Sequence, residues 1–336
     1  MGRLSRDKRD IFYRLAKEKG YRARSAFKLL QIDAEFDLFG TTKGGLVVQR
    51  AVDLCAAPGS WSQVLSDRLY EIQQRQKEDS TEDGAVEDDP DNDDSPNIVA
   101  VDLQPMAPID GVLCLQGDIT SKATAEAIIR HFKGKRAELV VCDGAPDVTG
   151  LHDVDEYLQG QLLLSAMLIS THVLCPNGTF VAKIFRGRQI SFLYQQLRIL
   201  FERVSVAKPS SSRNSSMESF VVCQHFKGGR YTDLPLEIGG FADVRDHLPK
   251  DDNSNVEDKE ASTASVSDLP PAVVPFIACG DLRGFGPPGM IIDADKSYPM
   301  DSKDYIAPIA PPIDPPYEAS MARQKEERQN KTANGR

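Results

Sequence analysis

Short apolar runs alternate with polar, turn-forming segments through the first two thirds of the chain, and they predict the strands of an α/β sheet. The runs that we assign to strands are residues 51–54, 97–103, 112–115, 138–142 and 180–185. Runs this short, bounded by turn residues, are typical of buried strands in a parallel sheet. Helical spacing of apolar residues predicts helices at about 60–70, 121–133, 155–175 and 188–202.

The junction from Val52 to Trp61 is the most informative segment. Pro58 and Gly59 force a tight turn directly after the first strand, and Ser60 is a candidate N-cap of the next helix. A strand, a glycine turn and a helix N-terminus hold a nucleotide-like ligand at the carboxyl edge of an open α/β sheet. A pyrophosphate-binding turn carries Gly-x-Gly-x-x-Gly, whereas this turn has a single glycine. The turn therefore favours a ligand without a pyrophosphate, such as S-adenosylmethionine.

Acidic side chains follow three of the predicted strands. Asp102 ends the second strand, Asp118 follows the third and Asp143 follows the fourth. An acidic residue at the end of the second strand can accept hydrogen bonds from the ribose hydroxyls of an adenosine. Asp118 stands where the amino group of an adenine could be recognised. Because parallel strands end at one edge of a sheet, the three carboxylates predict one site at that edge.

Lys183 lies within the fifth strand, where a lysine is unexpected unless its amine reaches a polar site. The fourth and fifth strands should be neighbours, which would put Lys183 beside Asp143. An amine with an ordinary pKa of about 10.4 acts as a base at neutral pH only if burial or a second cation, such as Lys28, lowers that pKa. Asp143 would oppose this shift while orienting the amine. The candidate catalytic residues are Lys28, Asp143, Lys183 and Glu218.

Charge is distributed unevenly along the chain, whose net charge is −10. Residues 1–30 contain ten Lys or Arg and three acidic residues, with four aromatic side chains among them. Such a segment suits phosphate contact and base stacking on RNA. The alternative is a solvated helical face whose aromatics belong to the core. The basic residues that we expect to contact phosphates are Arg6, Lys8, Arg9, Arg22 and Arg24.

Two acidic segments, residues 71–97 and 246–268, contain eleven and seven acidic residues against two basic residues each, so without them the rest of the chain has a net charge of +4. Both are poor in apolar residues, and we expect them to be disordered loops. The first lies between a helix and a strand, where an insertion costs little free energy. We interpret it as a passive insertion.

The six cysteines are scattered without a Cys-x-x-Cys pair, and the five histidines are equally dispersed. This distribution predicts a reduced, cytoplasmic protein without a metal site. No apolar run reaches the roughly 18 residues of a membrane span. The N-terminus lacks the apolar stretch of a secretory signal.

These motifs resemble the FtsJ-like RNA 2′-O-ribose methyltransferases over about residues 7–224. That family uses a Lys-Asp-Lys-Glu tetrad on a Rossmann-like sheet, and the matching residues are Lys28, Asp143, Lys183 and Glu218. The resemblance implies that Lys183 is the proton acceptor and that S-adenosyl-L-methionine is the cofactor. The residues that match the family's cofactor contacts are Gly59, Trp61, Asp102, Asp118 and Asp143.

Within the family, segments 143–157 and 208–216 are similar to the eukaryotic branch that methylates the tRNA anticodon loop. Segments 274–282, 297–300 and 311–317 are similar to the C-terminal part of that branch. The resemblance implies a tRNA substrate, modified at position 32, at the wobble position 34 or at both. It also implies an auxiliary protein subunit of WD-repeat or large helical-repeat type. The alternatives are a ribosomal-RNA methyltransferase and a non-catalytic RNA-binding protein on a methyltransferase fold.

The expected architecture is a seven-stranded, Rossmann-like α/β methyltransferase domain over residues 48–226, with the last strand antiparallel. Strands six and seven are expected at about 203–207 and 218–225. Basic RNA-contacting helices would occupy 1–47, one of them over about 25–39. Residues 227–317 are expected to form an extended segment packed on the domain, and 318–336 a disordered tail.

Overall fold

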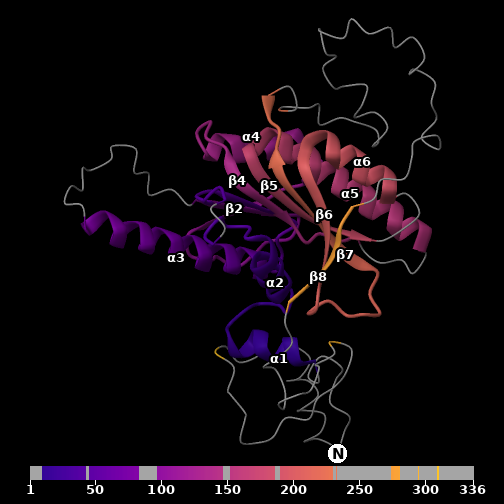
Figure 1. Ribbon diagram of the computed structural model, residues 1–336, viewed down its shortest axis with the longest axis horizontal. Coiled ribbons are helices and arrows are strands. Elements are labelled where there is room, and N and C mark those ends of the chain that lie inside the picture. The colour runs from indigo at the N-terminus through magenta and orange to yellow at the C-terminus, as the bar shows by residue number, and fades with distance from the viewer. Residues whose placement is uncertain are drawn as a thin grey trace, which may run out of the picture.

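The computed structural model of the protein describes residues 10–42, 45–82, 97–146, 152–185, 190–229, 232, 274–280, 294 and 309. Within them, one sheet lies between two layers of helices (Figure 1). The strands are β1 Ala51–Leu54, β2 Ile98–Asp102, β3 Val112–Gln116, β4 Ala137–Cys142, β5 Leu174–Phe185, β6 Phe201–Pro209, β7 Glu218–Phe226 and β8 Phe276–Cys279. The helices are α1 Ile11–Glu18, α2 Ala26–Phe36, α3 Ser60–Glu82, α4 Lys122–His131, α5 His152–Val173 and α6 Ile190–Leu200.

The strand order is β3-β2-β1-β4-β5-β7-β6-β8. The strands from β3 to β5 are parallel neighbours, and β7 is antiparallel to both β5 and β6. The predicted parallel sheet with an antiparallel seventh strand is therefore confirmed. The chain moves outward in opposite directions from β1 and from β4, and ligands of α/β sheets bind at the carboxyl edge of such a switch point.

The sheet has an eighth strand, β8, in the segment that the sequence predicted as an extended tail. β8 pairs in parallel with β6, with Val206 opposite Phe276 and Pro209 opposite Cys279. Its side chains are largely exposed, with only Cys279 fully buried. A four-residue edge strand next to prolines shows little of the burial pattern by which strands are recognised. The tail thus contributes directly to the sheet.

Helix α3 is longer than predicted and ends at Glu82 rather than near residue 70. The stretch from 71 to 82, which we expected to belong to a disordered insertion, is therefore helical. Ile72 is buried and extends the apolar face formed by Leu65 and Leu69, and the Gln, Glu, Arg and Lys residues beyond it favour helix formation. The rest of the acidic insertion, 83–96, lies outside the described residues, as do 246–268 and 318–336.

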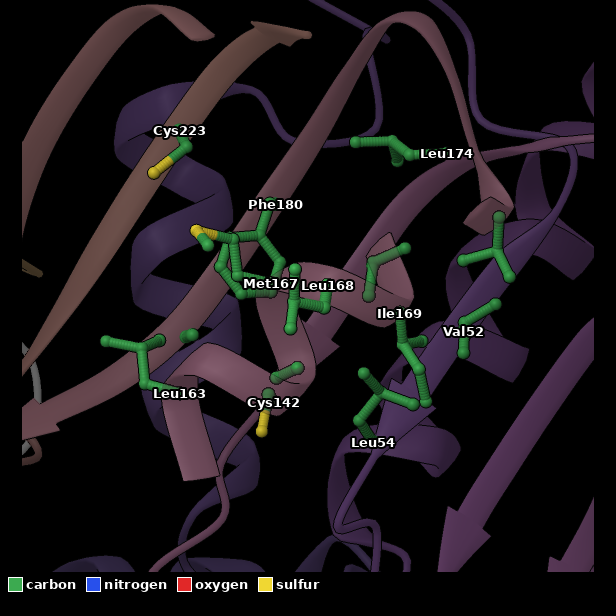
Figure 2. Packing of buried hydrophobic residues seen from close by; sticks show 14 of the residues in the cluster. Val52, Leu54, Cys142, Leu163, Met167, Leu168, Ile169, Leu174, Phe180 and Cys223 are labelled. Atoms are coloured by element: carbon green, nitrogen blue, oxygen red, sulfur yellow. The ribbon is translucent and has the colours of Figure 1, made fainter. Parts of the chain in front are cut away.

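Alternate side chains of the strands point into two hydrophobic clusters, one on each face of the sheet. On one face, Val52 and Leu54 belong to one cluster with Met167 and Ile169 of α5 (Figure 2), and α4 and α6 complete this layer. On the other face, α2 and α3 cover the sheet. Helix α2 is therefore one of the covering helices of the sheet, and it is fixed by burial on the same face as the first turn of α3.

Helix α1 packs on α2 through a third cluster, in which Phe12 contacts Phe27 and the C-terminal residue Ala294 joins them. The backbone N–H of Ile309 also donates to the carbonyl oxygen of Lys17 at 3.3 Å. Two described residues of the C-terminal segment, Ala294 and Ile309, thus contact the N-terminal helices. Among the described helices, none is both long enough and apolar enough to cross a membrane.

Candidate active site

The turn between β1 and α3 lies at the switch point and contains Gly59. Gly59 has a φ of 104°, which L side chains rarely adopt. A Cβ atom at this position would lie 2.7 Å from Arg22 Nη1. Arg22 donates hydrogen bonds to the carbonyl oxygens of Pro58, Ala107 and Pro108 at 3.0, 2.9 and 2.8 Å. Glycine is required here by the backbone and by the guanidinium group that packs over the turn.

Trp61, one of the predicted cofactor contacts, is 2% exposed. Its indole nitrogen donates to the carbonyl oxygen of Ser25 at 2.8 Å, and its ring centroid lies 5.6 Å from that of Phe220. Ser25 precedes α2, which carries Lys28, and Phe220 belongs to β7, which begins with Glu218. Trp61 therefore packs the Gly59 turn against the two elements that carry these catalytic candidates.

Asp102 and Asp118 stand at the carboxyl ends of the adjacent strands β2 and β3. The Asp102 carboxylate accepts hydrogen bonds from the backbone N–H groups of Ala57 at 2.9 Å and Gln104 at 2.8 Å. The exposed Asp118 carboxylate accepts bonds from the backbone N–H of Thr120 at 2.8 Å and from its hydroxyl at 2.7 Å. Because a carboxylate has about four acceptor positions, both groups can still bind a ligand.

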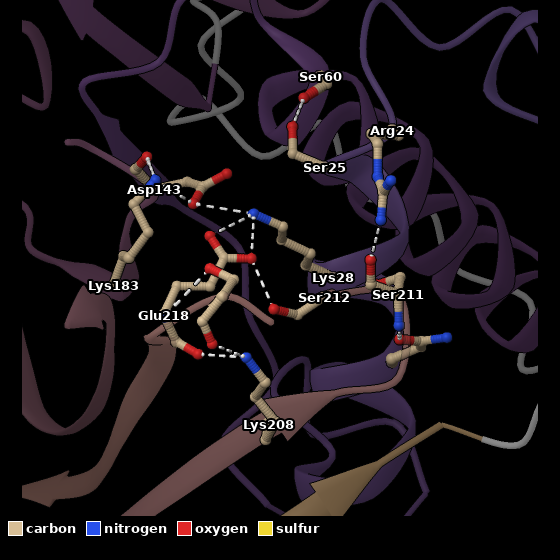
Figure 3. A network of polar contacts seen from close by, with 12 residues as sticks. Arg24, Ser25, Lys28, Ser60, Asp143, Lys183, Lys208, Ser211, Ser212 and Glu218 are labelled. Carbon is tan, nitrogen blue, oxygen red and sulfur yellow. Dashed lines mark hydrogen bonds and ion pairs between the residues drawn. The ribbon is translucent and has the colours of Figure 1, made fainter. Parts of the chain in front are cut away.

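The four predicted catalytic residues meet at the carboxyl ends of β4 and β5, although each comes from a different part of the chain (Figure 3). The Lys183 amine donates to the Asp143 carboxylate at 2.9 Å and to the Asp143 carbonyl at 2.7 Å. The Lys28 amine lies 2.9 and 3.0 Å from the two carboxylate oxygens of Glu218 and 3.9 Å from Asp143 Oδ1. The result is an alternating row of two lysines and two carboxylates.

The protonation of this row is set by burial and by the neighbouring charges. Burial alone would lower the pKa of the Lys183 amine, but the charge and hydrogen bond of Asp143, helped by Glu218, raise it above its ordinary value. Burial opposes ionisation of Glu218, yet the Lys28 charge and the Ser212 hydrogen bond bring its pKa down to about 2. Lys28 is paired with Glu218. It therefore does not lower the pKa of the Lys183 amine, as a second cation could.

The hairpin between β6 and β7 supports Glu218 through two residues of segment 208–216 whose contacts the sequence did not predict. Ser212, which is 2% exposed, donates its hydroxyl to Glu218 Oε1 at 2.7 Å. The Lys208 amine donates to the carbonyl oxygens of Ser216 and Glu218 at 2.9 and 2.7 Å. These bonds fix both the backbone and the carboxylate of Glu218 within a tight turn. No spacing rule finds such contacts, because they depend on how the hairpin closes.

Asp53, in the middle of β1, is a further acidic group that the sequence did not single out. It is 1% exposed, and its Oδ2 accepts a 2.6 Å hydrogen bond from the Ser62 hydroxyl. Its Oδ1 has no hydrogen-bond partner among the described residues. Burial, with smaller contributions from the charges of Asp143 and Asp102, raises the pKa of Asp53 to about 7. A carboxyl group inside an apolar strand is the same signal that identified Lys183.

Replacing Asp53 with asparagine should stabilise the ligand-free protein at alkaline pH. The folded protein holds the Asp53 proton more tightly than the unfolded chain does, so wild-type stability is lost as pH rises from about 4 to about 7. The loss is on the order of 4 kcal/mol at pH 8. Thermal melts at pH 5 and pH 8 should show the variant's advantage growing with pH. An equal difference in melting temperature at both pH values would contradict this.

Two arginines of the basic N-terminal segment are engaged in internal contacts, which changes their interpretation. Arg22 bonds to the Gly59 turn and to the carbonyl oxygens of Ala107 and Pro108, as described above. Arg24 pairs with the buried Asp10 and donates to the carbonyl oxygen of Ser211. Both guanidinium groups therefore stabilise the fold around the site, and neither is a simple phosphate ligand. The other predicted phosphate contacts lie outside the described residues: Arg6, Lys8 and Arg9.

The assembled site offers acid–base chemistry on a polar ligand. It places a buried amine beside carboxylates, next to a turn and two strand ends suited to an adenosine. Among the described residues, no group of three or more His, Cys, Asp or Glu side chains could hold a metal ion. Lys183 can exchange a proton with a bound hydroxyl, and Asp143 can orient the amine for that exchange.

Comparison with known proteins gives consistent matches. The model of the family described as FtsJ-like methyltransferase matches residues 21–226. The chain is 49% identical over 332 residues to a human protein named tRNA (cytidine(32)/guanosine(34)-2'-O)-methyltransferase, covering 97% of this chain and 86% of the human one. A protein of the same name from Schizosaccharomyces pombe is 50% identical over 324 residues, covering 96% of this chain and 97% of the relative.

A third relative matches a shorter part of the chain. A Drosophila melanogaster protein named tRNA (guanosine(34)-2'-O)-methyltransferase is 57% identical over 226 residues, covering 67% of this chain and 64% of that protein. The similarity to the human and fission-yeast proteins extends well beyond residues 21–226. The C-terminal segment that contains β8 therefore lies within the length shared with these relatives.

Proposed function

Because the chain belongs to the FtsJ-like methyltransferase family, we propose that it is an S-adenosylmethionine-dependent 2′-O-methyltransferase of the tRNA anticodon loop. The observation that carries the proposal is the row of Lys28, Asp143, Lys183 and Glu218, in which Lys183 is buried and the other three are half-buried. The names of the relatives favour tRNA over ribosomal RNA as the substrate, at position 32, position 34 or both.

The chemistry of the switch point suits S-adenosylmethionine. Asp102 would accept hydrogen bonds from ribose hydroxyls, and Asp118 would accept one from the adenine amino group. The Gly59 turn has no glycine-rich cradle for a pyrophosphate, and Asp53 keeps one buried oxygen unpartnered among the described residues, close to the charges of Asp102 and Asp143. When bound, S-adenosylmethionine supplies a methyl group on a positively charged sulfur, and that carbon–sulfur bond breaks as the ribose oxygen attacks.

In this proposal each catalytic residue has a separate task. Lys183 takes the proton of the ribose 2′-hydroxyl, and Asp143 orients the Lys183 amine through the 2.9 Å hydrogen bond. Glu218 holds Lys28, which lies 3.9 Å from Asp143 and balances the two carboxylates. Because its pKa is raised, Lys183 is mostly protonated at neutral pH, so the rate depends on its small neutral fraction. An auxiliary protein subunit that sets the modified position stays a prediction.

Ribose-methylation mapping of total tRNA and ribosomal RNA after deletion of the gene tests this function. We expect 2′-O-methylation at position 32, position 34 or both to disappear. Wild-type protein should restore it and the Lys183→Ala variant should not. Loss of methylation confined to ribosomal RNA would replace the proposed substrate. Unchanged RNA, together with no binding of S-adenosylmethionine in a calorimetric titration, would instead indicate a non-catalytic protein on this fold.

The basic N-terminal segment should account for part of the salt dependence of tRNA binding. Neutralising Arg6, Lys8 and Arg9 should reduce the slope of log affinity against log salt concentration by about 2. Each phosphate contact contributes about 0.7 to that slope on single strands. Arg22→Gln is the matched comparison, because it removes internal hydrogen bonds and should lower the melting temperature instead. Binding across a salt series measures both variants. An unchanged slope in the triple variant would exclude these residues as phosphate contacts.

A further inference from the structure

Gln159 joins the two strand ends that carry Asp143 and Lys183. It belongs to α5, it is 4% exposed, and its side-chain nitrogen is the donor in two hydrogen bonds. One goes to the carbonyl oxygen of Lys183 at 2.9 Å, and the other to the carbonyl oxygen of Gly144, directly after Asp143, at 3.2 Å. A single amide group therefore holds the backbone at both catalytic candidates.

The position of this amide is explained by where β4 ends. The last paired residues of β4 and β5 are Cys142 and Ala182. The next pair along the strands would be Asp143 and Lys183, but β4 stops at Cys142 while β5 continues to Phe185. Beyond the end of β4, the Gln159 amide bonds both to the segment that follows β4, at Gly144, and to β5, at Lys183. It takes the place of the backbone pairing that would otherwise set the spacing of the two strands there.

The buried Gln159 side chain has an energetic cost. Its oxygen, Oε1, is buried and has no hydrogen-bond partner among the described residues, and buried polar atoms are rarely left so. The reverse orientation of the amide would point an oxygen at two carbonyl oxygens. A residue needed only for packing would be apolar in this layer, which is otherwise formed by residues such as Leu163 and Met167.

We propose that Gln159 is a positioning residue for methyl transfer, which keeps the Lys183 amine and the Asp143 carboxylate at their working distance. The inference rests on the proposed function, because it assigns the Lys183–Asp143 pair to the reaction. Gln159 touches neither substrate nor cofactor in this role, and it acts through the backbone of the two residues. Displacement of a reacting group by about 1 Å can cost about 10²-fold in rate.

The test compares Gln159→Leu with Gln161→Leu in single-turnover methyl transfer to unmodified tRNA. Full-length protein is used, and extract from cells lacking the gene is added to supply any auxiliary subunit. Gln161 is half-buried on the same helix, and its side chain is about 200° around the axis from Gln159. We expect the Gln159 variant to lose about 10²-fold in rate with unchanged S-adenosylmethionine affinity, and the Gln161 variant to keep wild-type rates.

The pH–rate profile separates positioning from a general loss of stability. If Lys183 and Asp143 move apart, the carboxylate raises the lysine pKa less, so the acid limb of the profile should shift to lower pH. A slower Gln159→Leu protein with an unshifted limb and a lower melting temperature would overturn the proposal in favour of a structural role. Wild-type rates in that variant would overturn it directly. Absence of methyl transfer by wild type would instead refute the proposed function.

Discussion

Lys183→Ala is expected to slow methyl transfer by about 10²–10⁴-fold, the usual effect of losing a general base. S-adenosylmethionine affinity should stay within a few-fold, because among the described residues the Lys183 amine bonds only to Asp143, which is one of five predicted cofactor contacts. Single-turnover rates and calorimetric titration of the purified variant measure the two quantities separately. A variant with wild-type single-turnover rates would end the assignment of Lys183 as the proton acceptor.

Lys183→Arg distinguishes a base from a fixed positive charge. Arginine keeps the charge beside Asp143 but does not lose its proton in the accessible pH range. If Lys183 acts as a base, the arginine variant should be as slow as the alanine variant. The wild-type rate should also rise about tenfold per pH unit below the pKa of Lys183, which Asp143 and Glu218 raise despite burial. A fast arginine variant would show that the lysine only orients or stabilises charge.

The strand-end residues could be predicted from the sequence because parallel topology constrains them strongly. Once β4 and β5 are neighbours, Asp143 and Lys183 must stand at the same edge, and the observed 2.9 Å bond agrees with that. Asp102 and Asp118 follow the same rule on β2 and β3. The apolar runs were enough to locate these positions, since a short buried strand is recognised by its own residues.

The contacts that hold the site together could not be predicted in this way. Arg22 bonds to carbonyl groups 36 to 86 residues away, and Gln159 bonds to one 24 residues away. Such bonds depend on the packing of whole elements, and a single arginine or glutamine in a helical or loop segment carries no sign of its partner. The sequence therefore predicts Arg22 as a phosphate ligand, whereas three of its guanidinium N–H groups bond inside the fold.

Edge elements were missed for a different reason. β8 is short and largely exposed, so its side chains show no clear alternation. Its role is nevertheless close to the site, because the carbonyl oxygen of Cys279 accepts a 2.8 Å hydrogen bond from the N–H of Ser210. Ser210 opens the turn that leads to Ser212, the hydrogen-bond donor to Glu218. The C-terminal segment thereby supports the hairpin between β6 and β7 from the outside of the sheet.

Gly59→Val is expected to abolish S-adenosylmethionine binding and to lower the melting temperature at the same time. The structure directs a Cβ atom at this position toward Arg22 Nη1 at 2.7 Å and Ile109 Cδ1 at 2.8 Å. The positive φ adds strain of about 1–3 kcal/mol for any residue with a side chain. Relief of the collision would displace the guanidinium group from the three carbonyl groups that it joins.

Asp102→Asn is the matched variant, because it should weaken cofactor binding without disturbing the Gly59 turn. Asparagine keeps an oxygen that can accept the bond from the Ala57 N–H, now 2.9 Å from Oδ2, and it loses the negative charge. A hydrogen bond to a charged group contributes about 1.5–3 kcal/mol, so affinity should fall by about 10- to 150-fold. Calorimetric titration and thermal melts of both variants separate the two effects. Since only Gly59→Val disturbs Arg22, a similar fall in melting temperature for Asp102→Asn would show that the carboxylate acts mainly as a structural acceptor.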